Sequence, residues 1–206
     1  MPFDLNKETI DVKGVADEAV KDDNVLNELL DGILSTKDVL RFNSFKVLNL
    51  LSEERPEMLY HKWDFFAVML NSDNAYHKLI AIRLIANLTK VDTNNKFETL
   101  FNKYYNLLND SVIIAGHITA LSGKIAQAKP KLQKQITKQL LNIDKTEQKH
   151  KDLIKAGAID SFSEYFESVK DKKKIIKFVK EQLESTSPKT KKKAKEFLEK
   201  WNISTS

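Results

Sequence analysis

The 206-residue chain contains no cysteine and has only five glycines and four prolines. Without cysteine, neither a disulfide framework nor a thiolate metal site can form, and a cytoplasmic location is expected. A protein of this length that contains β-sheet needs more turn residues than these, so we expect helices joined by short loops. No run approaches the roughly 18 apolar residues of a membrane-spanning helix, so we expect no membrane partner.

Catalytic motifs are also missing. The chain has no glycine-rich phosphate loop, no Gly-x-Ser-x-Gly sequence and no recognisable set of kinase or hydrolase residues. The histidines fall on different predicted helices, and no two have the i, i+4 spacing of a metal-binding helix; they are His61, His77, His117 and His150. The sequence therefore predicts no enzyme, no cofactor and no metal site.

Charge, by contrast, is abundant and unevenly distributed. Residues 1–123 carry 13 basic against 18 acidic side chains, whereas residues 124–206 carry 21 against 11. A basic C-terminal half can attract an anionic partner such as nucleic acid or an acidic protein. The alternative, which we favour, is a lysine-rich solvated surface, because charge runs such as Lys172–Lys174 and Lys191–Lys193 usually lie on exposed helix faces.

Apolar residues recur at helical spacing along nearly the whole chain, and the breaks fall at polar or proline-containing positions. This pattern predicts a leading helix over residues 5–21, followed by five helix pairs. The expected pairs are 23–35 with 37–54, 56–71 with 74–91, 94–109 with 111–128, 130–144 with 147–168, and 171–185 with 187–201.

The second helices of these pairs align without gaps. Their first aligned residues, 36 to 40 positions apart, are Arg41, Lys78, Ala115, Lys155 and Lys191. Offsets of three, seven and ten from them carry mostly small or apolar residues and share one face of a helix, so we expect that face to be buried. Stacked pairs would then bury a continuous core. Gly116 and Gly123 lie inside the third of these helices, which predicts a bend or a close contact there.

The last second helix resembles a HEAT repeat. It has Ser187-Pro188 in the turn and a basic residue at the usual position, followed by the small and large apolar residues Ala194, Leu198 and Trp201. A similar stretch at 70–74 is followed by Lys78, Ala81, Ile85 and Leu88. The resemblance to HEAT/armadillo-like helical repeats covers about residues 23–201.

This resemblance implies an all-α fold, an α-α superhelix of about five helix pairs plus an N-terminal helix. We expect an N-terminal capping helix at 1–22, a single HEAT-like repeat domain at 23–201 and a C-terminal tail at 202–206. HEAT-like families are mostly binding scaffolds whose second helices line a concave surface, so the resemblance implies a non-catalytic protein–protein interaction scaffold. A subunit of a larger assembly is an equally compatible reading.

A nucleic-acid-binding protein is the alternative, because some HEAT-like proteins are alkylpurine DNA glycosylases. The resemblance to these enzymes would imply aromatic and acidic residues on a basic concave face. In this sequence, no pair of an aromatic residue and an aspartate falls on the predicted inner face. The outward stripe at offsets five and nine instead offers a basic strip, with partner-binding candidates Lys46, Arg83, Asn87 and Lys124, followed by Asp160 and Glu164. Mixed charge favours a protein or peptide over a continuous phosphate backbone, although an ordinary hydrated helix face has the same pattern.

The basic residues at the aligned positions also have a structural interpretation. Acidic residues precede three of them by three to five positions: Asp38, Asp73 and Asp152. Oppositely charged groups near a helix start form ordinary ion pairs. We therefore expect the aligned residues to pair within their own repeats instead of forming a ladder that binds anions.

Overall fold

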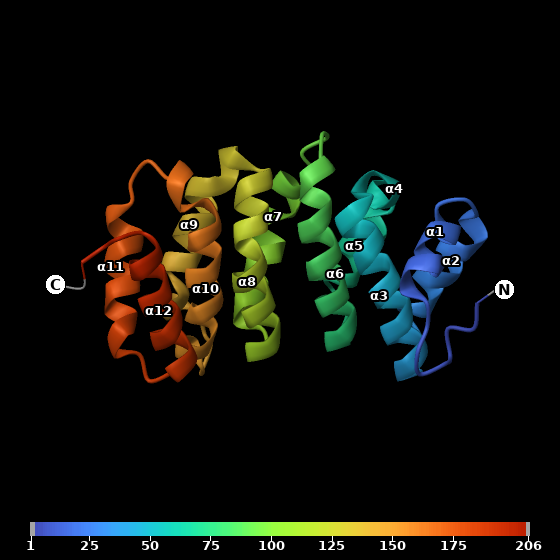
Figure 1. Cartoon of the computed structure of the whole chain (residues 1–206), viewed down its shortest axis with the longest axis horizontal. Coiled ribbons are helices and arrows are strands. Elements are labelled where there is room, and N and C mark those ends of the chain that lie inside the picture. The colour runs from blue at the N-terminus through green and yellow to red at the C-terminus, as the bar shows by residue number, and fades with distance from the viewer. Residues whose placement is uncertain (1–2, 205–206) are drawn as a thin grey trace. The chain divides into compact units, whose positions relative to one another are not determined.

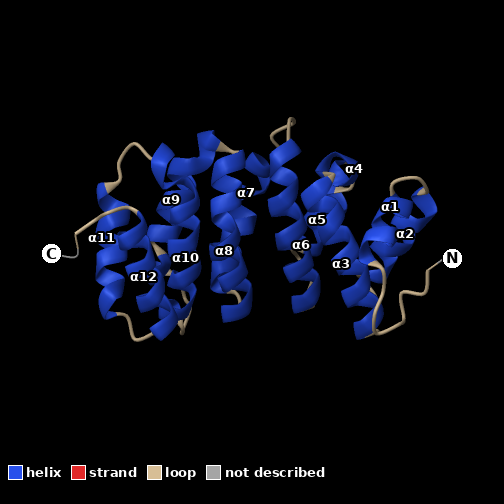
Figure 2. Cartoon of the chain, viewed as in Figure 1, coloured by secondary structure: helices blue, strands red, loops and turns tan. Residues whose placement is uncertain are grey.

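The computed structural model describes residues 3–204, which form helices and turns with no strand among them (Figures 1 and 2). This confirms the all-α class and the expected order of a leading helix followed by five helix pairs. The chain divides into two compact units, the first ending at Thr93 and the second beginning at Asn94. The predicted domain limits at residues 22 and 201 stay predictions.

The first unit holds the leading helix and two pairs. Its helices are α1 (Val12–Ala19), α2 (Asp23–Gly32), α3 (Asp38–Glu54), α4 (Pro56–Tyr60), α5 (Trp63–Met69) and α6 (Ala75–Leu88). The leading helix is shorter than predicted, because the Asp11 side chain accepts a hydrogen bond from the Gly14 amide and caps the helix there. The predicted helix over 56–71 is divided at His61 and Lys62 into α4 and α5.

The second unit holds three pairs. Its helices are α7 (Lys96–Asn106), α8 (Val112–Ala128), α9 (Gln133–Leu141), α10 (Lys151–Tyr165), α11 (Lys173–Glu181) and α12 (Pro188–Lys200). Each first helix ends in a 3-10 turn, respectively Leu107–Asn109, Ile143–Lys145 and Gln182–Glu184. Such turns tighten the last turn of a helix and satisfy carbonyl groups that would otherwise lack donors.

The predicted buried stripe of the second helices is confirmed. All residues at offsets three, seven and ten are buried except Trp201, which is partly exposed at the end of α12; the buried ones are Ser44, Leu48, Leu51, Ala81, Ile85, Leu88, Ile118, Ser122, Ile125, Ala158, Phe162, Tyr165, Ala194 and Leu198. Because one stripe is buried in every second helix, each unit has a core built from successive pairs.

Hydrogen bonds also recur near the repeat period. Asn87 Nδ2 on α6 donates to Ser52 Oγ on α3 at 2.7 Å, 35 residues away. The Thr190 hydroxyl on α12 donates to the carbonyl of Asp152 on α10, 38 residues away. Such bonds join neighbouring second helices, and their buried polar groups would be costly to leave unpaired.

The close contact predicted for the third pair is confirmed between α8 and α10. A Cβ atom at Gly123 would lie 2.8 Å from Ser161 Cα, and one at Gly157 would lie 2.9 Å from the backbone nitrogen of Ala120. The Ser161 hydroxyl donates to the Thr119 carbonyl at 2.5 Å and accepts from the Gly123 amide at 2.8 Å. Glycine at these two positions therefore allows α8 and α10 to approach closely enough for Ser161 to contact the α8 backbone.

The segment before α1 is attached to α3 by one buried side chain. Asn43 Nδ2 donates to the carbonyls of Leu5 at 2.9 Å and Lys7 at 2.8 Å. We expect Asn43→Ala to cost about 1–3 kcal/mol, because both bonds and their buried donor group are lost. Amide hydrogen exchange over residues 5–11 should accelerate, and unchanged exchange there would contradict this role. Asn27→Ala, at an exposed position of α2, is the matched control.

Candidate interaction surface

One stripe of the second helices faces away from the buried core. Offsets five and nine lie on it. The position two residues before the aligned residue also lies on it, because it precedes offset five by seven residues, which is almost two full helical turns. In four of the five second helices that position carries a large exposed apolar side chain: Val39, Tyr76, Ile113 and Leu153, exposed by 42, 57, 62 and 51%. In α12 the same position is Lys189.

These apolar residues were not predicted as site residues, although the sequence carries a signal for them. They lie two turns before Lys46, Arg83, Ala120 and Asp160, on the stripe that the alignment had already defined. Extending the alignment backwards would have found them. Helix caps fix this first turn: the Asn74 side chain accepts from the Tyr76 amide at 2.9 Å, and Ser111 accepts from Ile114. Tyr76 and Ile113 therefore project from capped helix starts.

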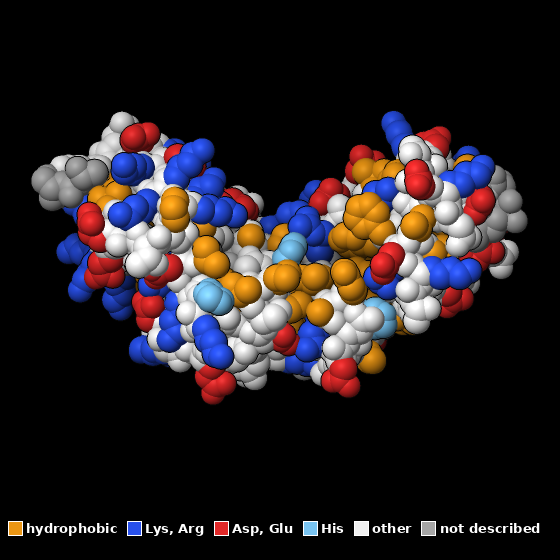
Figure 3. Space-filling model, turned by 90° about the horizontal axis from the view of Figure 1, so that it is seen from below, with side chains coloured by type: hydrophobic (Ala, Val, Ile, Leu, Met, Phe, Trp, Pro, Cys, Tyr) orange, Lys and Arg blue, Asp and Glu red, His pale blue; other side chains and the backbone are white. Residues whose placement is uncertain are grey.

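In the first unit, cations lie against the exposed aromatic rings. The Arg41 guanidinium carbon is 4.3 Å from the centre of the Tyr76 ring, and Arg41 also donates to the Ser35 carbonyl at 2.9 Å. Lys46 Nζ is 4.6 Å from the centre of the Phe42 ring, which is 60% exposed. Figure 3 shows hydrophobic side chains gathered beside Lys and Arg over the region of α3 and α6.

The four predicted site residues belong to both units. Lys46 on α3 and Arg83 on α6 are partly exposed at equivalent positions of the first unit, whereas Lys124 lies on α8 in the second unit. Asn87 is only 4% exposed and bonds to Ser52, so its side chain is part of the contact between α3 and α6. Offset nine lies at the side of the outward stripe, and in α6 the neighbouring helix α3 covers that side.

In the second unit the charges of the outward stripe interact with one another. Lys193 Nζ lies 3.0 Å from Asp160 Oδ1 and 3.2 Å from Glu196 Oε2, and the hydrogen bond that Lys193 donates to Asp160 is the main cause of the raised pKa of Lys193. Partial burial raises the pKa of Glu164, while the positive charge of Lys124 acts in the opposite direction. This face therefore combines both signs of charge.

The structural interpretation of the aligned basic residues is confirmed at two of them. Arg41 forms an ion pair with Asp38. Lys155, only 7% exposed, lies 3.4 Å from Asp152 Oδ1 and 2.8 Å from Asp144 Oδ1. These two cations are thus held by carboxylates of their own repeats; the pairing of Lys78 with Asp73 stays a prediction.

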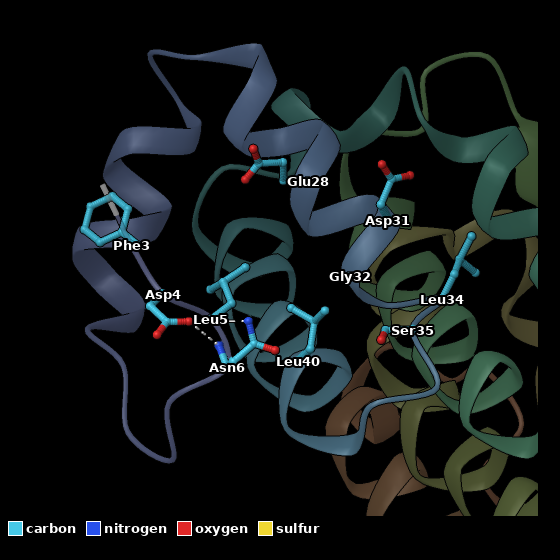
Figure 4. Close-up of a pocket in the computed structure, with 10 residues that line it drawn as sticks. All are labelled: Phe3, Asp4, Leu5, Asn6, Glu28, Asp31, Gly32, Leu34, Ser35 and Leu40. Atoms are coloured by element: carbon cyan, nitrogen blue, oxygen red, sulfur yellow. Dashed lines mark hydrogen bonds between the residues drawn. The ribbon is translucent and has the colours of Figure 1, made fainter. Parts of the chain in front are cut away.

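A cleft of about 700 Å³ lies at the start of the first unit (Figure 4). The N-terminal segment, the end of α2, the loop that follows it and Leu40 of α3 line it. Three carboxylates line this cleft: Asp4, Glu28 and Asp31. The Glu28 Oε2 atom is buried and accepts no hydrogen bond. The cleft is therefore negatively charged, in contrast to Lys46 and Arg83 farther along the two helices.

Residues 3–204 lack two further classes of site. In this range, histidine and carboxylate side chains nowhere form a group of three or more that could hold a metal ion. None of the helices in it combines the length and the apolar character needed to cross a bilayer.

Comparison with known proteins gives one match. A family model described as armadillo-like matches residues 108–202, slightly less than half of the chain. The matched range extends from the 3-10 turn after α7 through α12. No curated protein and no solved structure matches the chain. The match agrees with the HEAT/armadillo-like resemblance and with the buried stripe of α8, α10 and α12, so residues 108–202 are similar to armadillo-like repeats.

Proposed function

We propose that the chain is a non-catalytic protein-interaction scaffold whose outward second-helix stripe binds another protein. The observation that carries this proposal is the exposure of large apolar side chains at one repeated position: Val39, Tyr76, Ile113 and Leu153. Single exposed apolar residues are common, but their recurrence at the same position of the second helices within each unit is typical of an interface. The armadillo-like family suggests the same kind of function.

The charge pattern favours a protein partner over nucleic acid. A phosphate backbone is best matched by an unbroken positive track. In the second unit, where lysine is most abundant, the stripe of α10 carries Asp160 and Glu164, and Lys193 is paired with Asp160. The lysine excess of this unit is thus interrupted by acidic side chains on the proposed binding surface.

Site-specific photo-crosslinking in the native host tests this function. A photoreactive phenylalanine derivative would replace one residue at a time on the stripe, at Val39, Tyr76, Ile113 and Leu153. Val68 on α5 is the matched control, because it is apolar and 68% exposed but lies on a first helix. We expect discrete protein adducts from the stripe and none from Val68. Equal labelling at Val68, no adduct from the stripe, or nuclease-sensitive adducts would contradict the proposal.

A further inference from the structure

The start of α3 and α6 carries an unusual concentration of exposed apolar side chains. Four of the seven large hydrophobic residues that are exposed in the described chain lie on or next to these two helix starts: Leu34, Val39, Phe42 and Tyr76. Val39 and Phe42 are three residues apart on α3 and so are neighbours on its surface. Arg41 joins this surface to α6, because it contacts both the Tyr76 ring and the Ser35 carbonyl beside Leu34.

The two exposed rings are held in place before any partner arrives. The Tyr76 ring packs on Arg41, a side chain that is itself anchored by Ser35 and Asp38. Lys46 lies over Phe42. Cation–π contacts of this kind attract a cation to the face of an exposed ring and so restrain both side chains. Because restrained side chains lose less conformational entropy on binding, these rings are suited to act as anchors.

Two cations lie farther along the same stripe. Lys46 and Arg83 come seven residues after Val39 and Tyr76, about 10 Å along their helices at 1.5 Å per residue. Within residues 3–204 neither forms an ion pair, whereas Asp160, at the equivalent position of α10, is paired with Lys193. The charges of this surface are therefore not neutralised by the chain's own carboxylates, and a partner's carboxylates would complement them.

We propose, on the basis of the function proposed above, that this surface binds an extended acidic protein segment. The surface, which we name the α3–α6 face, comprises Val39, Phe42, Lys46, Tyr76 and Arg83. An apolar side chain of the segment packs against the Tyr76 ring, and a carboxylate about three residues away meets Arg83, while Lys46, which lies over the Phe42 ring, adds positive charge beside the segment. That spacing follows from the distance of about 10 Å and an extended rise of about 3.3 Å per residue.

The acidic cleft gives the bound segment a direction. Leu34, which precedes α3, lines this cleft together with the carboxylates of Asp4, Glu28 and Asp31, which would repel a negative charge. The acidic residues of the partner are consequently confined to the end of the face that carries Lys46 and Arg83. A basic segment would meet the opposite arrangement, with its charge repelled over the cations.

Selection of a phage-displayed random-peptide library on the full chain tests this specificity. We expect the enriched peptides to be net acidic, with an apolar residue about three positions from Asp or Glu. The best peptide, synthesised with a fluorophore, should bind at least about tenfold more weakly to Lys46→Glu/Arg83→Glu and to Phe42→Ala/Tyr76→Ala. The control Lys13→Glu/Lys90→Glu makes the same charge change at exposed positions off the face and should alter affinity less than about twofold.

Several outcomes would overturn the inference. The charge of the enriched peptides is measured on the unaltered chain, so enrichment of basic peptides, or of none, counts against it whatever the variants do. An equal loss in the control variant would show a general charge effect. A DNA duplex that binds the chain equally with and without Phe42 and Tyr76 would show a phosphate site instead. Protein adducts from Ile113 and Leu153 in the crosslinking experiment would leave the proposed function intact in each case.

Discussion

Alanine at Gly157 is expected to destabilise the second unit by about 1–3 kcal/mol, the usual cost of forcing extra volume into a packed site. The added methyl group would lie 2.5 Å from Thr119 Oγ1 and 2.9 Å from the backbone nitrogen of Ala120. The backbone atom can move only if α8 and α10 separate. Alanine at Gly123 should have a similar effect, because its Cβ would meet the Cα atom of Ser161 at 2.8 Å.

Gly116→Ala is the matched control, because Gly116 lies in α8, as Gly123 does. No atom lies within 4 Å of the position that its Cβ would occupy. The substitution should therefore stabilise α8 by up to about 1 kcal/mol, the difference in helix propensity between glycine and alanine. Urea unfolding of the three variants measures these effects. If Gly157→Ala and Gly116→Ala shift stability in the same direction, the close approach of α8 and α10 is not what requires glycine.

The repeated core was predictable from sequence because burial of one helix stripe leaves a period of 3.6 residues. The same period can continue where a helix is interrupted, so the period alone does not reveal the interruption. Leu59, Trp63 and Phe66 are all buried at spacings of four and three residues, so the pattern indicated one helix although the chain turns at His61 and Lys62. The start of α1 was missed for the opposite reason, since the buried Leu5 lies in a segment whose attachment depends on Asn43, a distant residue.

The exposed outward stripe was predictable only in part. Helical geometry placed Lys46 and Arg83 on the outward stripe, and both are partly exposed there. Geometry within one helix could not show that Asn87 is covered, because that depends on how closely α3 approaches α6. The ion pair between Lys193 and Asp160 could not be predicted either, because it depends on the distance between α10 and α12.

Asp152→Ala is expected to destabilise the second unit by about 2 kcal/mol at neutral pH, the usual scale for hydrogen bonds to a charged group. Asp152 Oδ2 accepts from the Thr186 amide at 3.1 Å and from its hydroxyl at 2.6 Å. Its other oxygen lies 3.4 Å from Lys155, which is nearly buried and would keep only Asp144 as a partner. The loss therefore affects both the turn before α12 and the start of α10.

The contribution of Asp152 should also depend on pH in one direction. The hydrogen bond from the Thr186 hydroxyl is the main cause that lowers the pKa of Asp152 below its ordinary value of 3.8. A carboxyl whose folded pKa is depressed stabilises the fold fully above its unfolded pKa, and this stabilisation is lost as the pH falls through the folded pKa. Denaturant unfolding of wild type and Asp152→Ala should give a constant difference from about pH 7 to about pH 5 that shrinks below 3.8.

Glu167→Ala, which removes an exposed carboxylate from the same unit, is the control and should leave stability nearly unchanged over this range. Asp152→Asn separates charge from shape, because it keeps an oxygen acceptor for Thr186 but not the negative charge beside Lys155. It should lose less stability than Asp152→Ala and show little pH dependence relative to it. A difference between wild type and Asp152→Ala that persists undiminished at about pH 3 would mean that the ionised carboxylate does not stabilise the contact between α10 and α12.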